Sequence, residues 1–169
     1  SERPLRMMPP RRGATQQEIV AIRHWQARDV RAWAASSLGL LEAREALPLL
    51  LKGAEDPDDF FLRMNSIRAL VAWGAPEVLP VLERRLGDPV ADVRLMALDG
   101  IARAGDRSAV EAVRGRLLDP EAEVRLKAVE AVVRFGDQGA RAGLEELRLK
   151  DPDPRVQQAA EGALGRLPR

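Results

Sequence analysis

The chain has 169 residues, of which 46% are hydrophobic and only 4% aromatic, and its 27 basic residues are balanced by 26 acidic ones. It contains no cysteine and a single histidine, so disulfides and thiolate–metal sites are excluded. No apolar run approaches the roughly 20 residues of a membrane-spanning helix, and no signal-peptide pattern opens the chain. We therefore expect a cytoplasmic protein without a membrane segment, whose core is built from Leu, Val and Ala.

The first segment, residues 1–14, is rich in Pro and Arg and has no hydrophobic periodicity. This composition predicts a flexible basic arm or a remnant of a longer chain. Thr15 and Glu18 then have the spacing of a capping box, which predicts a helix to about residue 27. Nine further helices are predicted near 29–41, 44–54, 58–73, 76–87, 91–104, 107–118, 121–135, 138–150 and 153–167. Residues 15–169 are thus predicted to form one domain, as a monomer or as part of a larger chain.

An aliphatic residue followed by Arg recurs about every 31 residues along this domain. The pairs are Val30-Arg31, Leu62-Arg63, Val93-Arg94 and Val124-Arg125, with a weaker copy at Val156-Gln157. An Asp-Pro pair precedes each of the last four copies, at Asp56-Pro57, Asp88-Pro89, Asp119-Pro120 and Asp151-Pro152. A second apolar segment completes each unit, so the sequence predicts a repeated pair of helices.

Start and stop signals are clearest in the unit that begins at Asp119. Asp119 is predicted to cap the first turn of a helix, and Pro120 fits the first helical position. Gly136 can adopt the left-handed conformation that ends a helix. Together they predict a helix that starts just after Asp119 and ends before Gly136.

This pattern resembles the short HEAT-like repeats found in phycobilisome-lyase-type and other bacterial proteins, over roughly residues 15–169. The resemblance implies an all-α fold, a right-handed α-solenoid of about five HEAT-like helix pairs. Tetratricopeptide repeats fit less well because the chain has no Tyr, and the ankyrin and leucine-rich patterns are absent. The resemblance is specific for the fold and much less so for function, because such repeats serve as generic scaffolds.

Residues that could carry chemistry do not form a catalytic pattern. His24 has no nucleophile motif near it in the sequence. Asp58-Asp59 and Glu145-Glu146 are adjacent pairs, and adjacent residues of a helix do not face each other. The glycines around 136–143 match neither a phosphate-binding loop nor a dinucleotide fingerprint. We therefore predict no enzyme activity, no cofactor and no metal site.

The recurring arginines Arg31, Arg63, Arg94 and Arg125 allow two interpretations. They could form an anion-binding ladder, or each could be a fork that binds carboxylate and carbonyl oxygens across neighbouring repeats. Recurrence in every unit favours the structural interpretation, because contacts to a ligand are rarely repeated identically.

Function is expected where the repeats differ, on the exposed stripe of the Val-Arg helices, which in this family lines the concave surface. The stripe is charged in its C-terminal half, whereas its N-terminal half combines aromatic residues and Met with Arg, which is typical of an interface core. The predicted partner-binding residues are Trp33, Phe60, Phe61, Met64, Arg68, Met96 and Asp99. The alternative is that Trp33 packs on the first helix and that Phe60 or Phe61 turns into the core.

The sequence therefore favours a non-catalytic scaffold that binds a partner protein or peptide through its concave face. A nucleic-acid-binding HEAT-like module is one alternative, although the stripe mixes charges of both signs instead of forming a basic face. The other is a lyase-type, enzyme-associated subunit, although nothing in the sequence marks a bilin site.

Overall fold

The computed structural model describes residues 30–37, 44–74 and 76–167. The predicted arm over 1–14, the predicted helix over 15–27 and His24 lie outside these residues. The described elements are a helix over 30–37, η1 (Arg44–Ala46), α2 (Leu47–Gly53), α3 (Phe60–Ala72), η2 (Pro76–Val78), α4 (Leu79–Arg85), α5 (Ala91–Ala104), η3 (Arg107–Ala109), α6 (Val110–Gly115), η4 (Arg116–Leu118), α7 (Ala122–Phe135), η5 (Gln138–Ala140), α8 (Arg141–Lys150) and α9 (Pro154–Arg166).

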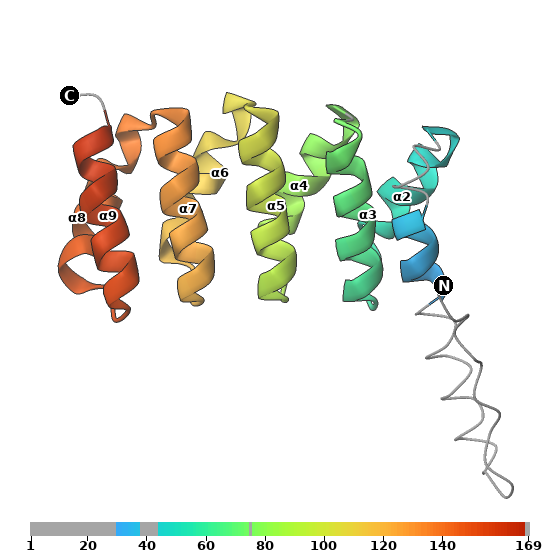
Figure 1. Ribbon diagram of the computed structural model, residues 1–169, viewed down its shortest axis with the longest axis horizontal. Helices are drawn as coiled ribbons and strands as arrows, with labels where there is room; N and C mark the ends of the chain where they lie inside the picture. The colour runs from blue at the N-terminus through green and yellow to red at the C-terminus, as the bar shows by residue number, and fades with distance from the viewer. Residues whose placement is uncertain (1–29, 38–43, 75, 168–169) are drawn as a thin grey trace, which may run out of the picture.

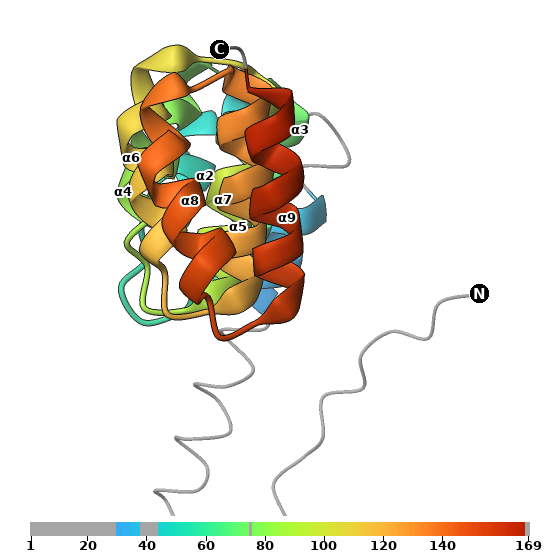
Figure 2. The same cartoon turned by 90° about the vertical axis from the view of Figure 1, so that its left-hand side faces the viewer.

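These helices form two parallel rows (Figures 1 and 2). The front row consists of the helix over 30–37 followed by α3, α5, α7 and α9, which are the Val-Arg helices, and the back row consists of α2, α4, α6 and α8. Neighbours within the front row from α3 onwards pack directly on one another. Each back-row helix packs on the next front-row helix, as α2 does on α3 and α8 on α9. The part of the chain that the structure describes is therefore all-helical, and the predicted α-solenoid is confirmed.

From residue 44 onwards, the observed helical segments begin and end within two residues of the predicted bounds. Gly105 and Gly136 end α5 and α7 in the left-handed conformation, at φ values of 70° and 60°. The predicted cap at Asp119 is wrong, because the N-cap of α7 is Glu121. The Asp119 carboxylate instead accepts a hydrogen bond from the backbone N–H of Glu121 at 3.0 Å and binds Arg94. An Asp before Pro therefore organises the turn between repeats and does not cap the helix directly.

One stripe of each front-row helix faces the back row. It consists of the aliphatic residue of the Val-Arg pair and the residues four and seven positions later. This stripe is buried in α3 (Leu62, Ser66, Ala69), α5 (Val93, Ala97, Gly100), α7 (Val124, Ala128, Ala131) and α9 (Val156, Ala160, Ala163). In the helix over 30–37, however, Val30 is 64% exposed, and Ala34 and Ser37 are exposed as well.

The difference follows from which helix precedes each stripe. A back-row helix covers the stripe in α3, α5, α7 and α9, whereas no described helix precedes residues 30–37 in the chain. The segment predicted to be helical over 15–27 occupies the corresponding place in the sequence, and its packing there stays a prediction.

Candidate partner-binding face

The middle junctions between repeats are built around a buried arginine, namely Arg63, Arg94 or Arg125. The side chain of Arg94 donates from Nε and Nη2 to the carboxylate of Asp119, at 2.8 and 2.7 Å. Its Nη1 donates to the backbone carbonyl oxygen of Asp88 at 2.9 Å. Arg125 repeats this arrangement with Asp151. The predicted fork, which binds a carboxylate and a carbonyl across neighbouring repeats, is therefore confirmed.

The two ends of this series are looser than its middle. Arg31 is half-exposed and lies 3.4 Å from the carboxylate of Asp56. At the other end Gln157 replaces Arg, and its Nε2 donates to the backbone carbonyl oxygen of Asp151 at 2.7 Å. The buried arginines of the middle repeats use their donors within the fold, which leaves them unavailable to a ligand.

The pKa values of these groups reflect the same contacts. The hydrogen bond to Asp119 raises the pKa of Arg94, and the hydrogen bond to Asp151 raises the pKa of Arg125. For Asp151, burial acts to raise the pKa, but hydrogen bonds from Arg125 and from the backbone N–H of Asp153 hold it below its ordinary value. The ionised form of Asp151 is thus stabilised by the folded chain.

Stability is expected to decline on acidification for this reason. Because the pKa of Asp151 is lower in the folded than in the unfolded chain, where it is about 3.9, its ionised carboxylate stabilises the fold above about pH 4. That contribution is lost as the pH falls through the folded-state pKa. Urea denaturation between about pH 7 and 3 should show the free energy of unfolding falling below about pH 4. The control, Arg125→Ala, should show a shallower decline because Asp151 has lost its partner, and stability that rises on acidification would contradict the assignment.

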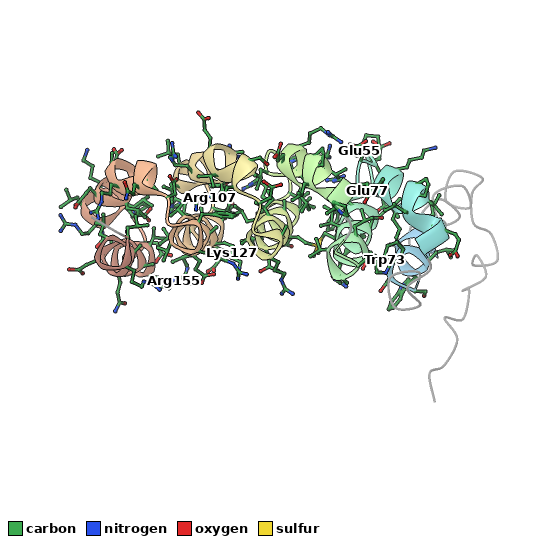
Figure 3. All side chains as sticks on the ribbon, turned by 90° about the horizontal axis from the view of Figure 1, so that it is seen from above. Glu55, Trp73, Glu77, Arg107, Lys127 and Arg155 are labelled. Carbon is green, nitrogen blue, oxygen red and sulfur yellow. The ribbon has the colours of Figure 1, made fainter. Side chains whose placement is uncertain are left out.

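The C-terminal half of the front face, the solvent-exposed side of the front row, is lined by internal ion pairs. Lys127 on α7 lies 3.2 Å from carboxylate oxygens of both Asp99 and Glu130. Arg155 on α9 donates to Glu123 on α7 at 2.7 Å. Lys127 and Arg155 are labelled along the front row in Figure 3. Asp99, one of the predicted binding residues, also accepts from Arg103 at 2.6 Å and so belongs to this ion-paired half.

The N-terminal half of the front face has a different character. Trp33 is 62% exposed and Phe61 is 52% exposed, although both are large aromatic residues. They line a hollow of about 260 Å³ between the helix over 30–37 and α3, together with Ala32, Ser36, Asn65 and Arg68. The structure therefore brings together three of the predicted binding residues, namely Trp33, Phe61 and Arg68.

The remaining predicted residues of this half lie beside the hollow without lining it. Phe60, Met64 and Met96 are partly buried and pack against the core. The ring of Phe60 lies 4.0 Å from that of Phe61, centroid to centroid, at an interplanar angle of 33°. The two adjacent phenylalanines thus face different ways. Phe60 packs against the core, and its ring contacts the exposed ring of Phe61.

A second hollow, of about 290 Å³, opens between the helix over 30–37, α2 and α3. Its lining is mostly apolar and includes Leu49, which is 63% exposed, and Leu50. Sequence reasoning did not single out this place. The only available signal was the run of three leucines at 49–51, which exceeds what one buried helix face requires.

The predicted absence of a metal site and the carboxylate pair at 58–59 concern the described residues. No group of three or more His, Cys, Asp or Glu side chains lies close enough there to hold a metal ion. Asp59 is buried at the start of α3, where its side chain accepts from the backbone N–H of Leu62 at 3.0 Å. Asp58 is exposed, so these two carboxylates are not arranged as a catalytic pair. Across the same residues, none of the helices has the length and apolar character needed to cross a bilayer.

Two packed rows of helices with a repeated arginine junction define a helical repeat scaffold. The chain belongs to the HEAT-repeat family, because the family model described as HEAT repeats matches residues 19–97 and 85–165. No curated protein matches the sequence.

Solved structures with a similar fold include the following two. One is the complex of CpcE and CpcF of phycocyanin lyase from Nostoc sp. PCC7120, with a TM-score of 0.66 and 26% identity, covering 95% of this chain and 68% of that chain. The other is an engineered protein, with a TM-score of 0.61 and 20% identity over 92% of this chain and 75% of that one, which shows a similar fold alone.

Proposed function

We propose that this chain is a non-catalytic scaffold that binds a protein or peptide partner through its front face, at the hollow between the helix over 30–37 and α3. The observation that carries this proposal is the pair of exposed aromatic rings, Trp33 and Phe61, lining a hollow beside Arg68. Aromatic residues and Arg are enriched at the centres of protein interfaces, where they supply most of the binding energy. The C-terminal half of the face offers no comparable anchor, because none of its described residues is an exposed large aromatic and because Lys127 and Arg155 are already ion-paired.

The charge distribution favours a protein over a nucleic acid as the partner. A nucleic-acid footprint requires a basic face that neutralises successive phosphates. Beyond Arg68 the front face instead mixes both signs, because the carboxylates of Asp92, Glu123 and Glu130 lie among the cations of Arg103, Lys127, Arg134 and Arg155. A polyanionic strand that followed the array would meet these carboxylates.

A second candidate function is supported by the likeness to the lyase complex. A fold of this kind occurs in the complex of CpcE and CpcF of phycocyanin lyase. We therefore propose, as the alternative, that the chain is one subunit of a lyase-type complex. The partner bound at the front face would then be the other subunit of that complex.

Site-specific photo-crosslinking in the source cell tests the proposed face. A photoreactive amino acid placed at Ser36, in the hollow, is expected to give a discrete adduct with a partner protein. The same amino acid at Glu83, which is exposed on the back-row helix α4, is the matched control and should give none. Mass spectrometry of the adduct would identify the partner and show whether it is a lyase subunit. Adducts from Glu83 but not from Ser36 would contradict binding at the front face.

A further inference from the structure

We infer that the hollow takes an apolar side chain from a partner segment and that Arg68 binds a carboxylate next to that side chain. This inference rests on the proposed function of the front face and specifies the chemistry of the partner. The partner segment would thus combine one aliphatic or aromatic anchor with one adjacent acidic group.

Arg68 is held at the rim of the hollow by a neighbouring amide. Its Nη1 donates to Oδ1 of Asn65 at 3.3 Å, while Nδ2 of Asn65 donates to the backbone carbonyl oxygen of Phe61 at 2.9 Å. A guanidinium group has five N–H donors arranged as a fork. The contact with Asn65 orients this fork and leaves most of its donors for a ligand, and a carboxylate is the group that such a fork binds in bidentate fashion.

Within the described chain, Arg68, like Arg134 on α7, differs from the ion-paired cations of the front face. Arg103, Lys127 and Arg155 each contact a carboxylate of the chain itself. No carboxylate of the described residues lies within 4.0 Å of the Arg68 guanidinium. The charge of Arg68 is therefore uncompensated at the one place on this face where two aromatic rings are exposed.

The surroundings limit the ligand to a single negative charge. The hollow itself is walled by Trp33, Phe61 and Ala32, which suits an apolar side chain. Asp92, exposed on the neighbouring front-row helix α5, would repel a longer run of negative charge on the partner. One carboxylate beside one apolar anchor is the pattern that this geometry accepts.

Short synthetic peptides test this chemistry directly. The probe is a fluorescein-labelled, amidated peptide of Gly and Ser that carries Leu-Phe followed by one Glu. Three counterparts replace that Glu with Gln, replace it with Lys, or replace Leu-Phe with Ala-Ala. Fluorescence anisotropy with the full chain is expected to show that the Glu peptide binds about fivefold more tightly than the Gln peptide, the upper range for an exposed ion pair. The preference should shrink as ionic strength rises, and the Ala-Ala peptide should bind most weakly.

Variants of the chain identify the cation responsible. Arg68→Gln should remove the preference for Glu over Gln, and Arg68→Lys should retain part of it. Arg134→Gln is the matched control, because Arg134 is an exposed arginine on α7 without an exposed aromatic neighbour on its helix, and the preference should survive there. Circular dichroism should show the same thermal transition for all three variants, since both arginines are exposed.

Several results would overturn the inference. The first is a Lys peptide that binds as tightly as the Glu peptide. The second is an equal loss of the preference for Glu over Gln in Arg68→Gln and Arg134→Gln. The third is Arg68-dependent binding of a thymidine oligonucleotide, which would indicate a nucleic-acid site. If the partner crosslinked at Ser36 binds Arg68→Gln as tightly as the unaltered chain, the inference fails while the proposed function stands. Absence of any adduct from Ser36 is the separate result that removes the proposed function.

Discussion

Arg94→Ala is expected to lower the free energy of unfolding by about 3–5 kcal/mol, the usual cost of removing one partner of a buried ion pair. The carboxylate of Asp119 would lose both hydrogen bonds from the guanidinium. Water cannot replace them readily, because Asp119 is only 4% exposed. The backbone carbonyl oxygen of Asp88 would lose its donor at the same junction. Urea denaturation followed by circular dichroism measures this change.

Arg103→Ala is the matched control for this experiment. Arg103 lies on the same helix, α5, and also binds an Asp, but its side chain is 68% exposed. An exposed pair of this kind contributes about 1 kcal/mol or less. Partner affinity, measured well below the melting temperature, should barely change in Arg94→Ala. A large loss of affinity with unchanged melting would mean that the arginine series binds a ligand after all.

Phe61→Ala is expected to weaken partner binding by about 2 kcal/mol or more, close to thirtyfold in Kd, while leaving the fold intact. Phe61 is 52% exposed and lines the hollow, so the loss of its ring removes an anchor and creates no internal cavity. A buried phenylalanine would instead cost about 3–5 kcal/mol of folding stability. Isothermal titration calorimetry with the crosslinked partner, purified, and a thermal melt separate the two effects.

The control for Phe61→Ala is Glu130→Ala, on the charged half of the same face, which should change both quantities much less. If Phe61→Ala unfolds the chain, the ring belongs to the core and the proposed patch is smaller than described. If fold and affinity both stay intact, the hollow is not the docking site.

The repeat period could be predicted from the sequence because each junction uses the same few residues. In every middle repeat the Arg binds the Asp of the next Asp-Pro pair along the chain. The Arg and the Asp-Pro pair therefore recur at a fixed spacing. The local cap at Asp119 could not be predicted in the same way. A carboxylate before Pro can cap a helix or bind an arginine from the preceding repeat. For Asp119 the outcome depends on its contact with Arg94, which lies 25 residues earlier in the chain.

The candidate site was only partly accessible from the sequence. Helical spacing placed Trp33, Phe61 and Arg68 on one exposed stripe, and the structure brings these three together at the hollow. Spacing did not distinguish Phe60 from Phe61, because adjacent residues at the start of a helix differ by about 100° and either could face the core. Met64 and Met96 also pack partly against the core, which their flexible side chains allow.

The helical repeat, its period and the Arg-carboxylate junctions could be predicted from the sequence, because they depend on local signals and on residues that recur in each unit. Which side chains stay exposed depends on the packing of the helices, since a helix face is buried when a neighbouring helix covers it. Val30 and Val93 show the difference: the same residue at the same position of the repeat is 64% exposed in one helix and fully buried in the other. The hollow beside Phe61 is a property of the same kind, because it exists only where the side chains of two front-row helices leave space between them.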